Sequence, residues 1–290
     1  MTNQLAVCRV GKSNRMDGMK NSMIAGLGHY VPENEVSNQD LEKIMDTTNE
    51  WIIERTGIEK RRWFNPDKDT VSNMATRAAK MALERANTDV KEVEFIVFAT
   101  ITPDYFFPGS GVLMQRELGL QGIGALDIRN ACSGFIYALS VADQFIKTGM
   151  YKTVLVVGAE IQSSALDKST EGRSSSVIFA DGAGAAVLKA TDEDKGVLST
   201  HLHADGDYAE ELYVKDPGSS RKVRLSQELI EGPTFNLTMN GNAVFKHAVV
   251  RFSEVIGEAL KQNGHAPEDI DLLVPHQANL RISNFVQKQM

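Results

Sequence analysis

The sequence predicts an α/β fold made of two related halves, because amphipathic helix patterns alternate with short apolar strands and one such unit occurs twice. Residues 82–99 and 259–276 each contain the end of an amphipathic helix, a polar turn, an acidic residue and an apolar strand. A shift of 177 positions (259 − 82) aligns them without gaps, and a helix follows each over residues 112–118 and 281–289. Length-matched repeats of this size indicate a duplicated α/β half rather than a solenoid. The alternative is a chance likeness between two ordinary helix–strand units.

The first copy continues through further elements that its local patterns predict. A strand leads into a helix whose apolar residues recur at i, i+3 and i+4, and a glycine ends that helix. Two more strand patterns follow, the last one divided by a tight turn at Ala180–Gly182. The predicted elements are a strand at 125–128, a helix from Ser133 to Gly149, a strand at 153–159, and two strands within 175–190.

The domain organisation follows from where the second copy stops. It has no counterpart of the first copy's later strands, so we expect an N-terminal half over residues 21–190 and an incomplete C-terminal half over residues 191–290. Residues 1–20 are polar and mildly basic and lack the apolar core of a signal peptide. We expect them to form a disordered lead-in, with Cys8 incidental.

The composition is that of a globular protein and excludes several classes. Hydrophobic residues make up 42% of the 290 positions and charged residues 24%. A net charge of −7 argues against general nucleic-acid binding. No apolar run approaches the roughly 20 residues of a membrane span. Two cysteines provide no disulfide framework, which suits a reducing cytoplasm.

Cys132 lies where a nucleophile is expected, at the start of a helix that follows a strand and a short turn. A thiol at such a position faces unpaired backbone N–H groups and the positive end of the helix dipole, which lower its pKa. The thiolate is the attacking species, so this location predicts reactivity. The small neighbours Ala131, Ser133 and Gly134 leave room for a substrate. The alternative is a buried, inert core thiol.

His276 is expected at the carboxyl end of the second repeat's strand, where α/β folds bind ligands. Gln277, Asn279 and Arg281 surround it with polar side chains in the segment VPHQANLRI. The alternative is a histidine satisfied by local hydrogen bonds. A cysteine and a histidine on equivalent edges of two duplicated halves suggest Cys/His acyl chemistry.

Two other patterns are weaker. His201 and His203 alternate on one strand face, but no third ligand is evident, so we expect no metal site. Gly182 and Gly184 do not form a dinucleotide fingerprint, because the GxGxxG spacing and the following helix are missing.

Several motifs together resemble one family. They are DTTNEWIIERTGI, NACSGFIYALSVADQFIKTG, FADGAGAAVL, STHLHADG and VPHQANLRI. With them the chain is similar to 3-oxoacyl-[acyl-carrier-protein] synthase III, the condensing enzymes that start type II fatty acid synthesis, from about Asn21 to the last residue. The resemblance implies a thiolase-like fold with duplicated αβαβα layered halves, of which the second is incomplete.

The resemblance also implies a ping-pong Claisen condensation without a cofactor. Cys132 would take an acyl group from acyl-CoA, and malonyl-acyl carrier protein would then bind and lose CO₂. His276 would stabilise the enolate, which attacks the acyl-cysteine; a neutral imidazole that donates a hydrogen bond suits this role.

Further roles are implied residue by residue. Trp51 and Arg55 match residues that contact the CoA nucleotide, and Arg173 matches a basic residue that holds the adenine. Asn279 matches the family's asparagine just past the histidine. The remaining matches are Phe107, which would reach the acyl pocket of the partner subunit in a homodimer, and Lys246 and Arg281, which would dock the acidic carrier protein. The alternative is that the aromatic side chains pack in the core and that the basic side chains lie on a solvated surface.

The chain departs from the family after His276. The family completes its site with an asparagine in a GNT motif and a glycine-rich loop, and neither follows here. We therefore expect an exposed His276, an apolar surface beside Val274 and no condensation activity.

Two alternative functions stay open at this stage. One is a related thiolase-superfamily condensing enzyme of secondary metabolism. The other is an inactive fragment or a non-catalytic partner subunit.

Overall fold

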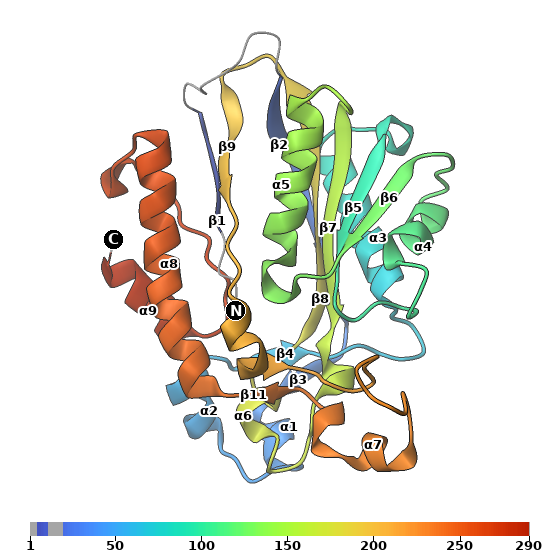
Figure 1. Ribbon diagram of the computed structural model, residues 1–290, viewed down its shortest axis with the longest axis vertical. Helices are drawn as coiled ribbons and strands as arrows, with labels where there is room; N and C mark the ends of the chain where they lie inside the picture. Colours follow the sequence, from blue (N-terminus) through green and yellow to red (C-terminus); the bar gives the residue numbers. More distant parts are fainter. Residues whose placement is uncertain (1–4, 11–19, 290) are drawn as a thin grey trace.

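The centre of the molecule is a five-stranded mixed sheet with the strand order β2-β8-β7-β5-β6 (Figure 1). The computed structural model describes residues 5–10 and 20–289. In the sheet, β5 runs parallel to β6 and β7, whereas β8 is antiparallel to both β7 and β2. The strands are β2 (Asn21–Tyr30), β5 (Phe95–Ala99), β6 (Gly124–Ile128), β7 (Thr153–Ile161) and β8 (Asp181–Thr191).

One long helix covers each face of this sheet. Helix α3 (Val71–Arg85) packs on one face and α5 (Gly134–Lys147) on the other, so the apolar strands are covered on both sides, as buried parallel strands require (Figure 1). Helix α3 lies very close to β2. A Cβ atom on Gly28 would come within 2.0 Å of the Ala78 carbonyl oxygen, so glycine is required there.

A second layer lies beside the main sheet. Strand β9 (Lys195–His201) pairs with β1 (Leu5–Val10), and α8 (Gly241–Asn263) packs against this pair. Helix α9 (Leu280–Gln289) packs on α8 (Figure 1). The expectation of a disordered lead-in is therefore wrong for residues 5–10, because β9 offers an edge for pairing. The rest of the expected lead-in, residues 1–4 and 11–19, lies outside the described residues.

Shorter elements close the lower end of the molecule in Figure 1 and the edge beside β6. They are β3 (Glu35–Ser37), β4 (Lys60–Arg62), β10 (Leu212–Tyr213), β11 (Thr238–Met239), α1 (Asn38–Glu42), α2 (Asn49–Thr56), α4 (Ser110–Glu117), α6 (Arg173–Ser176) and α7 (Gln227–Glu231). Among the described residues, no helix has the length and apolar character needed to cross a bilayer.

The predicted repeat is confirmed in the backbone that follows α3 and α8. The amide of Thr88 donates to the carbonyl of Leu83, and the amide of His265 donates to that of Leu260, 177 positions later. Each helix is then followed by a 3₁₀ turn, η1 (Val90–Glu92) or η6 (Pro267–Asp269), and these two turns are also 177 positions apart. In both turns an acidic side chain accepts a hydrogen bond from the amide three residues before it. The two segments therefore share their hydrogen-bonding pattern as well as their apolar spacing.

The two copies diverge directly after these turns. In the first copy β5 is paired on both sides, but residues 271–275 form no strand and pair with no described segment. The expected strand is absent because a strand requires a hydrogen-bonding partner. Leu272 is 77% exposed and Val274 68%. The expected apolar surface beside Val274 is thus confirmed.

The expectation of two strands within residues 175–190 is also wrong. Residues 173–176 form α6, and β8 is one continuous strand that begins at Asp181. The predicted turn residue Asp181 instead binds a neighbouring loop, since its carboxylate accepts hydrogen bonds from the Ser163 and Phe64 amides. The contact that decides this conformation therefore comes from residues far away in the sequence.

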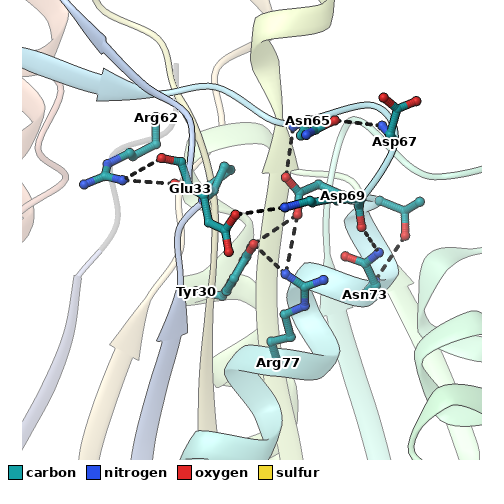
Figure 2. Close-up of polar contacts among 11 residues, drawn as sticks. Tyr30, Glu33, Arg62, Asn65, Asp67, Asp69, Asn73 and Arg77 are labelled. Atoms are coloured by element: carbon teal, nitrogen blue, oxygen red, sulfur yellow. Dashed lines mark hydrogen bonds and ion pairs between the residues drawn. The ribbon is translucent and has the colours of Figure 1, made fainter.

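A polar network fixes the start of α3 against the end of β2 (Figure 2). The Tyr30 hydroxyl donates to the buried Asp69 carboxylate at 3.0 Å, and the Arg77 guanidinium lies 4.6 Å from the Tyr30 ring. The other Asp69 oxygen accepts from the Asn65 amide at 2.9 Å. These contacts tie the loop before α3 to the sheet, which holds α3 in its place.

Candidate active site

Cys132 lies at the carboxyl end of β6, in a 3₁₀ turn (Ala131–Ser133) that leads directly into α5. The turn is closed by Ser133, whose amide and hydroxyl both donate to the carbonyl of Asn130. Gly134 approaches β5 so closely that an added Cβ would lie 3.1 Å from the Cβ of Ala99. The predicted strand–turn–helix context of Cys132 is confirmed, and its side chain is exposed rather than buried in the core.

The backbone just before the cysteine is strained. Ala131 has a φ of 48°, in the left-handed region that disfavours residues with a Cβ atom. Such a conformation costs about 1–2 kcal/mol, and strained positions of this kind cluster at active sites. The left-handed conformation of Ala131 turns the chain sharply between β6 and α5, and Cys132 lies in this turn.

The thiol pKa differs from the sequence-based expectation. Cys132 opens to solvent on one side, but most of its surroundings are protein, and this desolvation raises its pKa. The negative charge of Glu160 raises it further. The expected lowering is therefore not observed, because local helix geometry is outweighed by charge and desolvation from other strands.

Glu160 is the functional candidate that sequence reasoning missed. It lies near the carboxyl end of β7, and desolvation raises its pKa to about 7. Its carboxylate accepts from the Ile101 amide at 2.9 Å and the Thr102 hydroxyl at 2.7 Å. An acidic residue inside an otherwise apolar strand was the available signal.

His276 is exposed, as expected, in the extended segment before α9. Protein nevertheless surrounds much of the imidazole, and this desolvation lowers its pKa and favours the neutral form. Within the part of the chain that the structure describes, no hydrogen bond joins it to Cys132. Asn279, matched to the family's asparagine past the histidine, caps α9, because its side-chain oxygen accepts from the Ile282 amide at 3.1 Å. A second asparagine, Asn240, caps α8, because its side-chain oxygen accepts a hydrogen bond from the Ala243 amide.

The three predicted nucleotide contacts come together, with two guanidinium groups beside one aromatic ring. The guanidinium of Arg55 lies 4.5 Å from the centre of the Trp51 ring, and that of Arg173 lies 5.1 Å from it. Trp51 and Arg55 belong to α2, whereas Arg173 begins α6, more than a hundred residues later. An aromatic ring beside two cations suits a ligand that carries both a flat base and phosphates.

The loop after β5 carries exposed aromatic side chains. Phe107 is 79% exposed and Phe106 64% exposed. The guanidinium of Arg224 lies 3.9 Å from the Phe106 ring, which joins this loop to the segment before α7. Phe107 is therefore a surface residue, and the alternative of core packing is wrong for it.

The predicted docking residues lie on packed helices. Lys246 on α8 and Arg281 on α9 are both exposed. The Arg281 guanidinium lies 5.7 Å from the ring of Phe245, the residue before Lys246. The two cations therefore lie on two helices that pack against each other.

The histidine pair considered for metal binding has another partner. His201 and His203 each contact one oxygen of the Glu258 carboxylate on α8, at 3.0 and 2.6 Å. They join β9 and the segment after it to α8. No group of three potential ligands suited to a metal ion was found among the described residues.

Comparison with known proteins identifies the family. The family model described as 3-Oxoacyl-[acyl-carrier-protein (ACP)] synthase III matches residues 126–206, which include Cys132, α5 and Glu160. The β-ketoacyl-[acyl-carrier-protein] synthase III of Xanthomonas campestris pv. campestris is 48% identical over 271 residues, covering 93% of this chain and 80% of the relative. The chain belongs to the 3-oxoacyl-[acyl-carrier-protein] synthase III family.

Solved structures agree with this assignment. The synthase III from Aquifex aeolicus VF5 is 42% identical, with a TM-score of 0.83 over 92% of this chain and 80% of that one. The priming β-ketosynthase from the R1128 polyketide pathway is 34% identical, with a TM-score of 0.82 over 95% of this chain and 80% of that one. The thiolase-like α/β fold predicted from the motifs is confirmed, and the synthase III chain is an acyltransferase-type condensing enzyme.

Proposed function

We propose that this synthase III chain condenses a short acyl-CoA primer with malonyl-acyl carrier protein through an acyl-cysteine on Cys132, and this replaces the expectation of no condensation activity. The observation that carries the proposal is the position of Cys132, exposed on a strained turn between a parallel strand and a helix. The high identity to named relatives supports this reaction.

In the first half-reaction, the Cys132 sulfur attacks the thioester carbon of the acyl-CoA. A bond forms between that sulfur and the acyl carbon, the bond to the CoA sulfur breaks, and the thiol proton ends on the departing CoA thiol. Because the pKa of Cys132 is raised, little thiolate is present at pH 7 before the substrate binds. The proton must therefore leave the sulfur as the reaction proceeds.

In the second half-reaction, malonyl-acyl carrier protein loses CO₂ and the resulting enolate attacks the acyl-cysteine. We assign enolate stabilisation to His276. Its lowered pKa favours the neutral imidazole, which keeps one N–H that can donate a hydrogen bond to the developing oxyanion.

We assign substrate recognition to two separate surfaces. The ring of Trp51 with Arg55 and Arg173 beside it would hold the CoA nucleotide. Lys246 and Arg281 would attract the acidic carrier protein to a chain that is itself net negative. Asn279 would bind substrate beside His276, and its cap on α9 would hold it there.

We also propose a homodimer that works in the cytoplasm. The exposed Phe106 and Phe107 support a contact with a second copy, because two large apolar side chains at one loop tip are a typical interface feature. The chain's composition, with two cysteines, supports a reducing compartment.

A second candidate is a priming condensing enzyme of secondary metabolism. The likeness to the R1128 priming β-ketosynthase favours it, since that protein has the same fold at 34% identity. The chemistry at Cys132 is the same for both candidates, so they differ in primer and carrier protein. Comparing kcat/KM for primers of different length, with a fatty-acid and a polyketide carrier protein, separates them.

The proposal is tested by acylating the protein with a short acyl-CoA and measuring the intact mass. We expect one acyl adduct in the unmodified chain and in Cys8→Ala, and none in Cys132→Ala or after iodoacetamide treatment. Malonyl-acyl carrier protein is then added to follow the second half-reaction. An adduct that persists in Cys132→Ala, or a folded chain that never becomes acylated, would exclude the proposed mechanism; the latter result would favour a non-catalytic protein.

A further inference from the structure

The carboxylate of Glu160 is held by the loop that follows β5. One of its oxygens accepts from the Ile101 amide, and the other accepts from the hydroxyls of Thr102 at 2.7 Å and Thr100 at 3.5 Å. The Thr102 hydroxyl in turn accepts from the Ile161 amide at 2.9 Å. Residues 100–102 are thus bound to the end of β7 through one carboxylate.

The same loop is joined to the segment that carries the nucleophile. The Thr100 amide donates to the Ile128 carbonyl at 3.1 Å, which is where β6 ends. Two residues later, Asn130 provides the carbonyl that closes the Cys132 turn. A continuous set of hydrogen bonds and short backbone links therefore runs from Glu160 to Cys132 across three neighbouring strands.

Glu160 is also the carboxylate whose charge acts on the thiol. Its negative charge raises the pKa of Cys132, and burial raises the pKa of Glu160 itself to about 7. At neutral pH the carboxyl group is therefore close to half protonated, and its charge responds to its surroundings.

Other charged groups near this region have partners elsewhere or face solvent. On β6, Asp127 binds the Gly111 amide at 3.0 Å, and Arg129 after it is exposed. On α5, Asp143 forms an ion pair with Lys147 at 2.9 Å, several turns from the cysteine. Asp104, after β5, accepts from Ser72 at the start of α3.

We propose that Glu160 is a positioning residue for the reaction of Cys132. Its carboxylate fixes residues 100–102 beside the nucleophile turn, and its ionised form opposes formation of the Cys132 thiolate. This inference rests on the proposed function, in which Cys132 is the nucleophile. Glu160 takes no proton in the acylation step, because the proton of the thiol leaves with CoA.

The arrangement acts differently on the free and the acylated enzyme. The free thiol is kept protonated, which protects it from adventitious alkylation. In the acyl-enzyme the sulfur is neutral, so Glu160 no longer opposes it. Because the free thiol is already neutral at pH 7, acylation itself changes no charge beside Glu160; the two groups oppose each other only when the thiolate forms.

The test measures the rate of Cys132 alkylation by iodoacetamide from about pH 6 to about pH 11, so that the range includes the inflection of a thiol whose pKa is raised. Glu160→Gln removes the charge but keeps an oxygen that can accept from Ile101 and Thr102. We expect the inflection in the pH profile of the alkylation rate to move to lower pH in this variant, with alkylation at least about twofold faster at pH 7. The control is Asp127→Asn, which removes a desolvated carboxylate of the same sheet and should leave the inflection unchanged. Thermal unfolding checks that each variant is folded.

Thr102→Val provides an independent variant. It removes a hydrogen bond that favours the ionised carboxylate, so more Glu160 is protonated at pH 7, and the alkylation profile should move in the same direction. A purely structural role would slow alkylation without moving the inflection. An unchanged inflection in both variants, or a move to higher pH in either, would overturn the proposal. Alkylation needs no acyl-CoA, so a chain that shows the shift but is never acylated would contradict the proposed function and not the effect of Glu160.

Discussion

Asn87 and Gly264 occupy equivalent positions in the two halves and share one unusual backbone conformation. They are 177 residues apart (264 − 87), and both are left-handed, with φ values of 47° and 67°. Each amide donates to the carbonyl three residues earlier, that of Glu84 or of Lys261. Each residue lets the chain leave a long helix and enter a 3₁₀ turn. Asparagine and glycine are the residues that adopt this conformation most easily.

Replacing Gly264 with alanine should therefore destabilise the protein by about 1 kcal/mol. The new Cβ would meet no other atom, so the cost is confined to the backbone. Gly257→Ala is the matched control, because Gly257 lies inside α8 and its added Cβ also meets open space. There alanine should stabilise by about 0.5–1 kcal/mol. Urea unfolding of both variants checks the prediction, which fails if the two changes have the same sign.

Removing the ring of Trp51 should weaken acyl-CoA binding more than it slows the chemistry. The ring contacts both Arg55 and Arg173, and each such contact contributes about 0.5–1 kcal/mol at an exposed site. We expect Trp51→Ala to raise the KM for acyl-CoA about 3- to 10-fold with a smaller change in kcat. Arg77→Ala breaks a comparable contact, at 4.6 Å from the Tyr30 ring, and should leave this KM unchanged. A kcat loss alone in Trp51→Ala would argue against a nucleotide site here.

Charge reversal at Lys246 and Arg281 should separate the two half-reactions. The double variant replaces two exposed cations by glutamate, which repels an acidic carrier protein. We expect a higher KM for malonyl-acyl carrier protein, an effect that weakens at high salt, and nearly unchanged acylation by acyl-CoA. Lys261→Glu, at the far end of α8, is the control for overall charge. An equal loss in both half-reactions would indicate misfolding or a role in the CoA site.

Asp216 should contribute stability that is lost in acid. Its buried side chain binds Arg221 through both oxygens at 2.7 Å, and these contacts hold its pKa at about 2. The folded-state pKa is below the unfolded value near 4, so the contribution is complete above about pH 4 and disappears as the pH falls towards 2. Asp216→Asn should therefore be less stable than the parent at pH 7, with the difference shrinking below about pH 4. Glu228→Gln, an exposed change on α7, should show no such trend; a constant difference for Asp216→Asn across this range would contradict the assignment.

Much of the fold was predictable because its signals are local. The turn at Cys132, α5 and the repeat of residues 82–92 in 259–269 depend on apolar spacing and turn residues within about 20 positions, and the structure confirms each of them. The gathering of Trp51, Arg55 and Arg173 was implied by family motifs rather than by any local pattern.

Tertiary structure decided the features that depend on distant partners. Residues 5–10 form a strand because β9 lies beside them, whereas residues 271–275 do not because no described segment pairs with them. The pKa of Cys132 is raised by desolvation and by Glu160 on another strand, against the lowering expected from its helix. Spacing along the chain predicts how a segment can fold, but strand pairing, desolvation and charge interactions depend on what lies next to it in space.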